Sequence, residues 1–152
     1  MPEVIFFLRH GVAERDEADD AARRLTAEGE RQSEAAGQAL AALGAEVESC
    51  LTSPKVRAAD TARLACEPLG IEPETAPNLS GRFDSLELAA GRGDVLLVGH
   101  EPHFSEEIGR LTGAKAKLRK GGLAIVDGGT LLALLRPEDI AAIAAAAAEV
   151  RE

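Results

Sequence analysis

The chain has 152 residues, 45% of them hydrophobic, which is enough for one domain over residues 1–152. A formal net charge of −9 and the lack of tryptophan and tyrosine argue against a nucleic-acid partner, which requires clustered positive charge and stacking rings. No apolar run is long enough for a membrane span or a signal peptide. We therefore expect a cytoplasmic protein with no membrane partner, present as a monomer or a weak homodimer.

Apolar runs alternate with segments of helical spacing along the whole chain. In chain order they predict a strand over 4–8, a helix over 26–43, a strand over 47–52, a helix from 53 to about 69, a short helix over 84–90, a strand over 94–98, a helix over 103–111, a hairpin of 123–126 with 130–135, and a helix from 137. Ser53 and Pro54 are expected at the N-cap and first position of the second helix. Because the first three strands are continuously apolar, we predict a mostly parallel sheet in a three-layer α/β/α sandwich.

Two of the three histidines follow the ends of predicted strands. His10 comes after the first strand and is preceded by Arg9, and His100 comes after the strand over 94–98. Arg57 lies in the first turn of the helix that follows another strand. Ligands bind at the carboxyl ends of parallel strands, and helix N-termini favour anions. The sequence therefore predicts a phosphate pocket built from two arginines and two histidines.

Such a pocket would prepare His10 to act as a nucleophile. Neighbouring arginines disfavour a protonated ring, so we expect a lowered pKa for His10 and a free nitrogen lone pair. Arg9 and Arg57 would bind phosphate oxygens with their planar forks, and a protonated His100 would add a further hydrogen bond. Gly11 would let the backbone turn and the phosphate approach. These residues predict phosphoryl transfer through a phosphohistidine intermediate.

Three separated motifs resemble the histidine phosphatase superfamily, whose fold is called phosphoglycerate-mutase-like. They are LRHG at 8–11, TSPKVRAADTA at 52–62 and VGHEP at 98–102, and with RRLTAEG at 23–29 the chain is most similar to SixA-type phosphohistidine phosphatases. The resemblance implies His10 as the nucleophile and a phosphate pocket of Arg9, Arg57 and His100. It also implies that the enzyme uses no metal and no organic cofactor.

The resemblance leaves the proton donor open. Asp20 matches an acid that precedes the R-x-LT motif in SixA-like sequences, and Arg23 matches the arginine of that motif. We predict Asp20 as the candidate donor and Arg23 at the substrate-binding rim, although both are equally readable as solvated loop charges. Glu87 is a second candidate by position only, and Glu14, Asp16 and Asp19 share the acidic loop.

The substrate also stays open at this point. Transfer from a substrate histidine to His10 exchanges one P–N bond for another, so it needs little help from an acid. This favours a phosphorylated protein, while a small phosphorylated metabolite and a non-catalytic phosphate-binding module remain alternatives. A zinc site at His100 and His103 with Glu101 or Glu106 is disfavoured because Pro102 interrupts the ligand spacing. Cys50 and Cys66 are expected to be buried free thiols.

Overall fold

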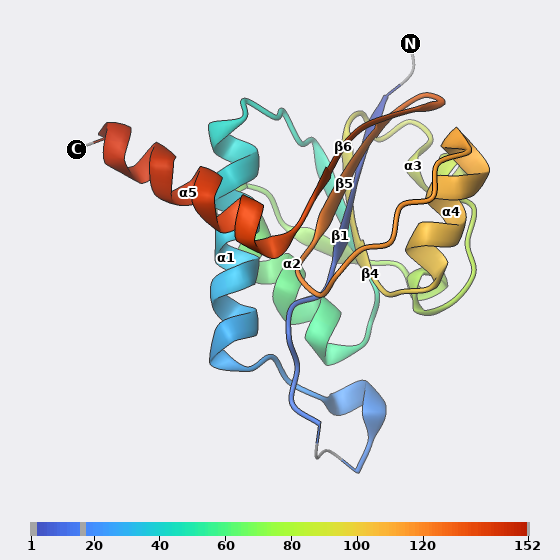
Figure 1. Cartoon of the computed structure of the whole chain (residues 1–152). Helices are drawn as coiled ribbons and strands as arrows, with labels where there is room; N and C mark the ends of the chain where they lie inside the picture. The colour runs from blue at the N-terminus through green and yellow to red at the C-terminus, as the bar shows by residue number, and fades with distance from the viewer. Residues whose placement is uncertain (1–2, 16–17, 152) are drawn as a thin grey trace.

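The computed structural model describes residues 3–15 and 18–151, so Asp16 of the acidic loop lies outside the described residues. One six-stranded sheet has the strand order β3-β2-β4-β1-β5-β6 (Figure 1). Its strands are β1 (Val4–Arg9), β2 (Ser49–Thr52), β3 (Pro73–Thr75), β4 (Val95–Gly99), β5 (Leu123–Asp127) and β6 (Thr130–Leu135). The helices are α1 (Ala27–Ala42), α2 (Val56–Leu69), α3 (Ser85–Ala89), α4 (His103–Thr112) and α5 (Pro137–Arg151), with single 3-10 turns η1 (Asp20–Ala22) and η2 (Pro77–Ser80).

The predicted mostly parallel sheet is confirmed. β1, β2, β3 and β4 pair in parallel, and the hairpin of β5 and β6 adds to β1 in the antiparallel sense. The edge strand β3 was not predicted, because Pro73–Thr75 contains no apolar run and is largely exposed. Edge strands have only one neighbour and one covered face at most, so they leave little pattern in the sequence.

Both faces of the sheet are covered, which explains the unbroken apolar strands. Phe6 and Leu8 of β1 pack in a core under α1, α2 and α5, while Ile5 and Phe7 pack in a second core under α3 and α4. The Phe7 and Phe104 rings meet edge to face with centroids 5.3 Å apart. Replacing a fully buried phenylalanine by alanine costs roughly 3–5 kcal/mol, so each face depends on such residues.

Helix starts agree with the sequence at α1 and differ at α2. The hydroxyl of Thr26 accepts a hydrogen bond from the Gly29 N–H, which confirms it as the N-cap of α1. The prediction that Ser53 and Pro54 begin α2 is wrong: the helix begins at Val56 after Lys55. The Ser53 N–H donates to the carbonyl of Val98 in β4, so the chain is still held by the sheet at this point.

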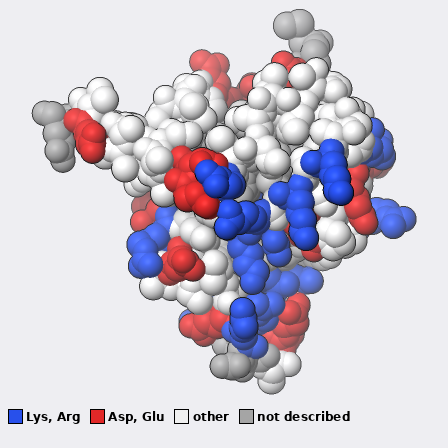
Figure 2. All heavy atoms as spheres, in the orientation of Figure 1, with Lys and Arg blue, Asp and Glu red and all other residues white. Residues whose placement is uncertain are grey.

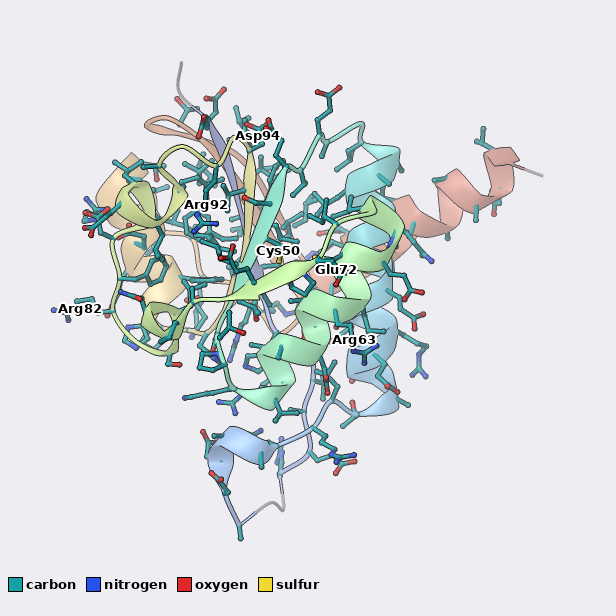
Figure 3. The ribbon with its side chains drawn as sticks, turned by 180° about the vertical axis from the view of Figure 1, so that it is seen from behind. Cys50, Arg63, Glu72, Arg82, Arg92 and Asp94 are labelled. Atoms are coloured by element: carbon teal, nitrogen blue, oxygen red, sulfur yellow. The ribbon has the colours of Figure 1, made fainter. Side chains whose placement is uncertain are left out.

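The register of the two central strands places the histidine motifs side by side. Arg9 at the end of β1 lies opposite Gly99 at the end of β4, and the His10 N–H donates to the Gly99 carbonyl over 3.1 Å. At the other end of these strands, the Asp94 carboxylate accepts a hydrogen bond from the Val4 N–H. Figure 3 shows Asp94 at that far end of the sheet. The two histidines therefore share the carboxyl edge of the sheet.

Two smaller expectations are settled by the same structure. Cys50 and Cys66 are buried and unpaired by a disulfide, as predicted, and Figure 3 shows Cys50 in the middle of the sheet. Among residues 3–15 and 18–151, every helix is too short or too polar to traverse a lipid bilayer.

Candidate active site

A polar pocket of about 200 Å³ lies at the carboxyl ends of β1, β2 and β4. Its lining residues are Arg9, His10, Arg23, Lys55, Arg57, Ser80, His100, Glu101, His103 and Lys120. Four residues that the sequence predicted as one site, Arg9, His10, Arg57 and His100, are thus brought together from three distant segments. The topology explains this convergence, because parallel strands direct their following loops to the same edge.

The ring of His10 is held with one unprotonated nitrogen facing the pocket. Its Nδ1 lies 2.8 Å from the carbonyl oxygen of Gly11. A carbonyl can only accept, so the proton of the neutral ring resides on Nδ1 and the lone pair on Nε2. Burial, together with the charges of Arg57 and Arg9, lowers the pKa of His10 to about 4. The predicted direction is confirmed, although burial rather than the arginines is the leading cause.

His100 faces His10 across the pocket and is anchored by Ser53. The two rings have centroids 5.1 Å apart and are tilted by 55°. The Nε2 of His100 lies 2.8 Å from the Ser53 hydroxyl, while its buried Nδ1 has no hydrogen-bond partner among the described residues. Burial and then the charges of His10 and Arg57 lower the pKa of His100 to about 3. The ring is neutral without ligand, and a bound phosphate would favour its protonation.

Arg57 connects His10 to the acidic loop. Its Nε donates to Nε2 of His10 over 3.4 Å, and its Nη1 donates to the Asp20 carbonyl over 2.9 Å. Arg9 is fixed differently, by a bond of 3.0 Å from Nη1 to the Leu118 carbonyl, and its buried Nε lacks a partner among the described residues. Both guanidinium groups border the space in front of His10, where a phosphoryl group would lie.

Asp20 accepts bonds from cations and is poorly suited to donate a proton. Its carboxylate lies 3.2 Å from Arg23, 3.3 Å from Arg57 and 3.8 Å from Lys55. The bond from Arg23 and the charge of Arg57 hold the pKa of Asp20 below its ordinary value. A general acid needs a raised pKa, so at neutral pH this carboxylate has no proton to give. Arg23 itself lines the pocket, next to the carboxylate it binds.

Gly11 packs against a helix, a role that was not predicted from the sequence, while its predicted place beside the phosphate stays a prediction. A Cβ at Gly11 would lie 2.7 Å from the carbonyl oxygen of Gly29 in α1, so the close contact of the two glycines requires the missing side chain. The Gly11 N–H donates to the Thr61 hydroxyl over 3.1 Å. That N–H is therefore already bonded and is not directed at a ligand.

Two further carboxylates bear on the proton donor: Glu87, which was predicted as a second candidate, and Glu101, which was not. Glu87 is exposed on α3 and does not line the pocket. Glu101 does line it, but its oxygens accept bonds of 2.7 and 2.8 Å from the backbone N–H groups of Ser105 and Leu118. Among the described residues, no three histidine, cysteine or acidic side chains are grouped as metal ligands.

The sequence analysis missed part of the lining. Lys55 precedes α2, Lys120 follows the segment that binds Arg9, and Ser80 ends η2. Lys55 lies inside the motif at 52–62 and could have been found there as a cation beside Arg57. Lys120 and Ser80 carry no local signal, because only the folding of distant segments brings them to the pocket.

Sequence comparison identifies relatives over most of the chain. The family model described as histidine phosphatase superfamily (branch 1) matches residues 5–89, which is more than half of the chain. An uncharacterised protein of Picosynechococcus sp. strain PCC 7002 is 35% identical over 135 residues, covering 78% of this chain and 81% of the relative.

Solved structures share the architecture. The protein histidine phosphatase SixA in complex with tungstate aligns with a TM-score of 0.81 and 25% identity, over 90% of this chain and 99% of SixA. An Escherichia coli K-12 protein proposed to be an alpha-ribazole-5'-P phosphatase aligns with a TM-score of 0.75 and 18% identity, over 90% of this chain and 98% of that one. The second match shows a common phosphoglycerate-mutase-like fold. Together with the family match, these findings show that the chain belongs to branch 1 of the histidine phosphatase superfamily.

Proposed function

We propose that the protein is a cofactor-independent phosphatase that removes a phosphoryl group from a phosphohistidine in a protein. The observation that carries the proposal is the orientation of His10. Its Nδ1 is committed to the Gly11 carbonyl, and its Nε2 faces a pocket lined by two arginines and His100. A neutral ring with an unprotonated nitrogen in a positively charged pocket is what nucleophilic attack on phosphorus requires.

The proposed reaction has two displacement steps. In the first, Nε2 of His10 attacks phosphorus, a new P–N bond forms, and the bond from phosphorus to the substrate nitrogen breaks. The released substrate histidine takes a proton from water. In the second, a water oxygen attacks phosphorus, the bond to His10 breaks, and inorganic phosphate leaves with the ring restored. Arg9, Arg57 and His100 stabilise the charge that builds on the phosphoryl oxygens in both steps.

The surroundings of Asp20 support a P–N substrate over an ester. An alkoxide is a poor leaving group, so ester hydrolysis gains roughly 10²–10⁴-fold from a general acid. Asp20 is held as an anion by Arg23 and Arg57, and the Glu101 oxygens accept backbone N–H bonds. Transfer between two histidine nitrogens is nearly balanced and tolerates this arrangement. The likeness to SixA, a protein histidine phosphatase, points in the same direction.

The test compares phosphate release from a phosphohistidine peptide with release from a panel of small phosphomonoesters. We expect a strong preference for the peptide. Labelled phosphate from the substrate should also become attached to the protein, in a bond that is stable in alkali and broken in acid. His10→Ala should abolish both turnover and labelling while the circular dichroism spectrum is unchanged. Vanadate should inhibit and EDTA should not.

Other outcomes of this experiment are equally informative. A preference for an ester would identify a phosphomonoesterase acting on a small metabolite and would make Asp20 the first residue to test as the acid. Binding of phosphate without turnover of any substrate would identify a non-catalytic module. Wild-type activity in His10→Ala would remove His10 from the mechanism.

A further inference from the structure

The catalytic pocket carries more positive charge than one phosphoryl group needs. Arg9, Arg23, Lys55, Arg57 and Lys120 all line it. The opposing carboxylates there are Glu101, whose oxygens accept backbone N–H bonds, and Asp20 at the rim. A phosphoryl group brings a charge of about −2. Positive charge is therefore left over, in a chain whose formal net charge is −9.

Three of the basic side chains that line the pocket are partly exposed, so the part of a substrate outside the pocket can contact them. We call Arg23, Lys55 and Lys120 the cationic rim. The segment that carries Lys120 is fixed at the pocket, because the N–H of the next residue, Gly121, donates to the His10 carbonyl over 2.9 Å. Burial and the nearby charges of Arg9 and Arg15 lower the pKa of Lys120. A band of basic side chains crosses the face drawn in Figure 2 from its middle to its lower end.

The volume of the pocket places most of the substrate outside it. About 200 Å³ is below the roughly 300–1,000 Å³ of sites that enclose a whole small molecule. The phosphoryl group and the ring that carries it would fill this space. The rest of the substrate would then lie across the rim, in contact with the surface rather than enclosed by it.

The cavity next to the pocket differs in charge from the cationic rim. A second cavity of about 710 Å³ adjoins the pocket at His103 and is lined by three carboxylates, Asp84, Glu106 and Glu107, with Arg82 and Arg110. Arg110 is paired with Glu107 at 2.7 Å and with Asp84 at 3.1 Å. This cavity therefore has no surplus of positive charge, and the rim attracts an acidic substrate more strongly.

We propose that the cationic rim of Arg23, Lys55 and Lys120 binds carboxylates that flank the phosphorylated histidine of an acidic protein substrate. The inference rests on the proposed function. Asp20 shows that a carboxylate fits this rim, since it already lies within ion-pair distance of Arg23 and Lys55. A substrate carboxylate would bind next to Lys120 and take part in the same group of ion pairs.

The experiment uses two phosphohistidine peptides that differ only in flanking glutamates or glutamines. The quantity compared is the ratio of kcat/KM for the glutamate peptide to kcat/KM for the glutamine peptide. For the wild-type protein we expect this ratio to be about ten at low salt and to approach one at about 0.5 M salt. Lys120→Gln should lower the ratio by about threefold, and the double variant with Lys55→Gln should lower it further. Lys115→Gln, which removes the same charge from an exposed lysine beyond the far end of α4, should leave the ratio unchanged.

The outcomes separate this inference from the proposed function. Equal turnover of the two peptides would overturn the rim as a docking site while leaving the phosphohistidine phosphatase intact. Turnover of neither peptide would overturn the proposed function itself. Faster turnover of a small ester with a second phosphate than of either peptide would assign the rim to a small bisphosphorylated ligand and overturn the protein substrate.

Discussion

The hydroxyl group of Ser53 lies 2.8 Å from Nε2 of His100, a residue that lines the polar pocket. Ser53 is fully buried, and its own N–H is bonded to the Val98 carbonyl in the neighbouring strand. The hydroxyl therefore has a fixed position from which it orients the ring of His100. This relationship makes Ser53 a positioning residue rather than the helix cap that its sequence context indicates.

Replacing Ser53 by alanine should therefore lower the rate more than the affinity. Without the hydroxyl, the His100 ring loses its hydrogen bond to Ser53. No other side chain among the described residues forms a hydrogen bond with this ring. We expect kcat on a phosphohistidine peptide to fall about tenfold with a smaller change in KM, as for loss of one hydrogen bond of roughly 1–2 kcal/mol. Steady-state kinetics would show this. Ser49→Ala, at the opposite end of β2, is the control, and an unchanged kcat in Ser53→Ala would refute the role.

Replacing Asp20 by asparagine distinguishes a proton donor from an electrostatic partner. The lowered pKa of Asp20 and its contacts with Arg23 and Arg57 predict that Asp20→Asn changes turnover of a phosphohistidine peptide by no more than about threefold. A general acid would instead show a loss of roughly 10²–10⁴-fold on phosphomonoesters. Measuring both substrates with Asp19→Asn as the control decides between the two roles.

The pH dependence of the protein should reflect the buried histidines. With a pKa of about 4, His10 keeps its lone pair well below pH 6.5, so kcat/KM should fall only as the pH drops toward 4. His10 and His100 both bind protons more readily in the unfolded chain, so the free energy of unfolding should also fall as the pH drops below about 6.5. Titration of the ring signals by NMR measures this directly. The chain in urea serves as the control, and a folded-state value near 6.5 for His10 would contradict the prediction.

Replacing Gly11 by alanine should destabilise the fold. The added methyl group would meet the Gly29 backbone of α1, which has no flexible side chain to move aside. We expect a loss of about 1–3 kcal/mol in the free energy of unfolding, measured by urea denaturation. Gly81→Ala places the same group in open space and should cost little in comparison. If both variants unfolded at the same urea concentration, the close contact would have no energetic importance.

The sequence by itself determined five of the six strands, their order along the chain and the core of the site. Short apolar runs bounded by turn residues indicate strands buried on both faces, and the residues that end parallel strands meet at one edge of the sheet. This reasoning reaches Arg9, His10 and His100 without coordinates. Arg57 is placed in the same site because it lies in the first turn of a helix that follows a strand.

Only the tertiary structure decided what surrounds those residues. Ser53 bonds His100 because β2 continues as far as Thr52 and postpones the start of α2. The pKa of Asp20 is lowered because Arg23 and Arg57 converge on its carboxylate. Lys120 reaches the pocket through a loop more than a hundred residues away from His10 in the chain. Local patterns record burial and backbone propensity, whereas the charge and hydrogen bonds at a site depend on contacts between segments that are distant in sequence.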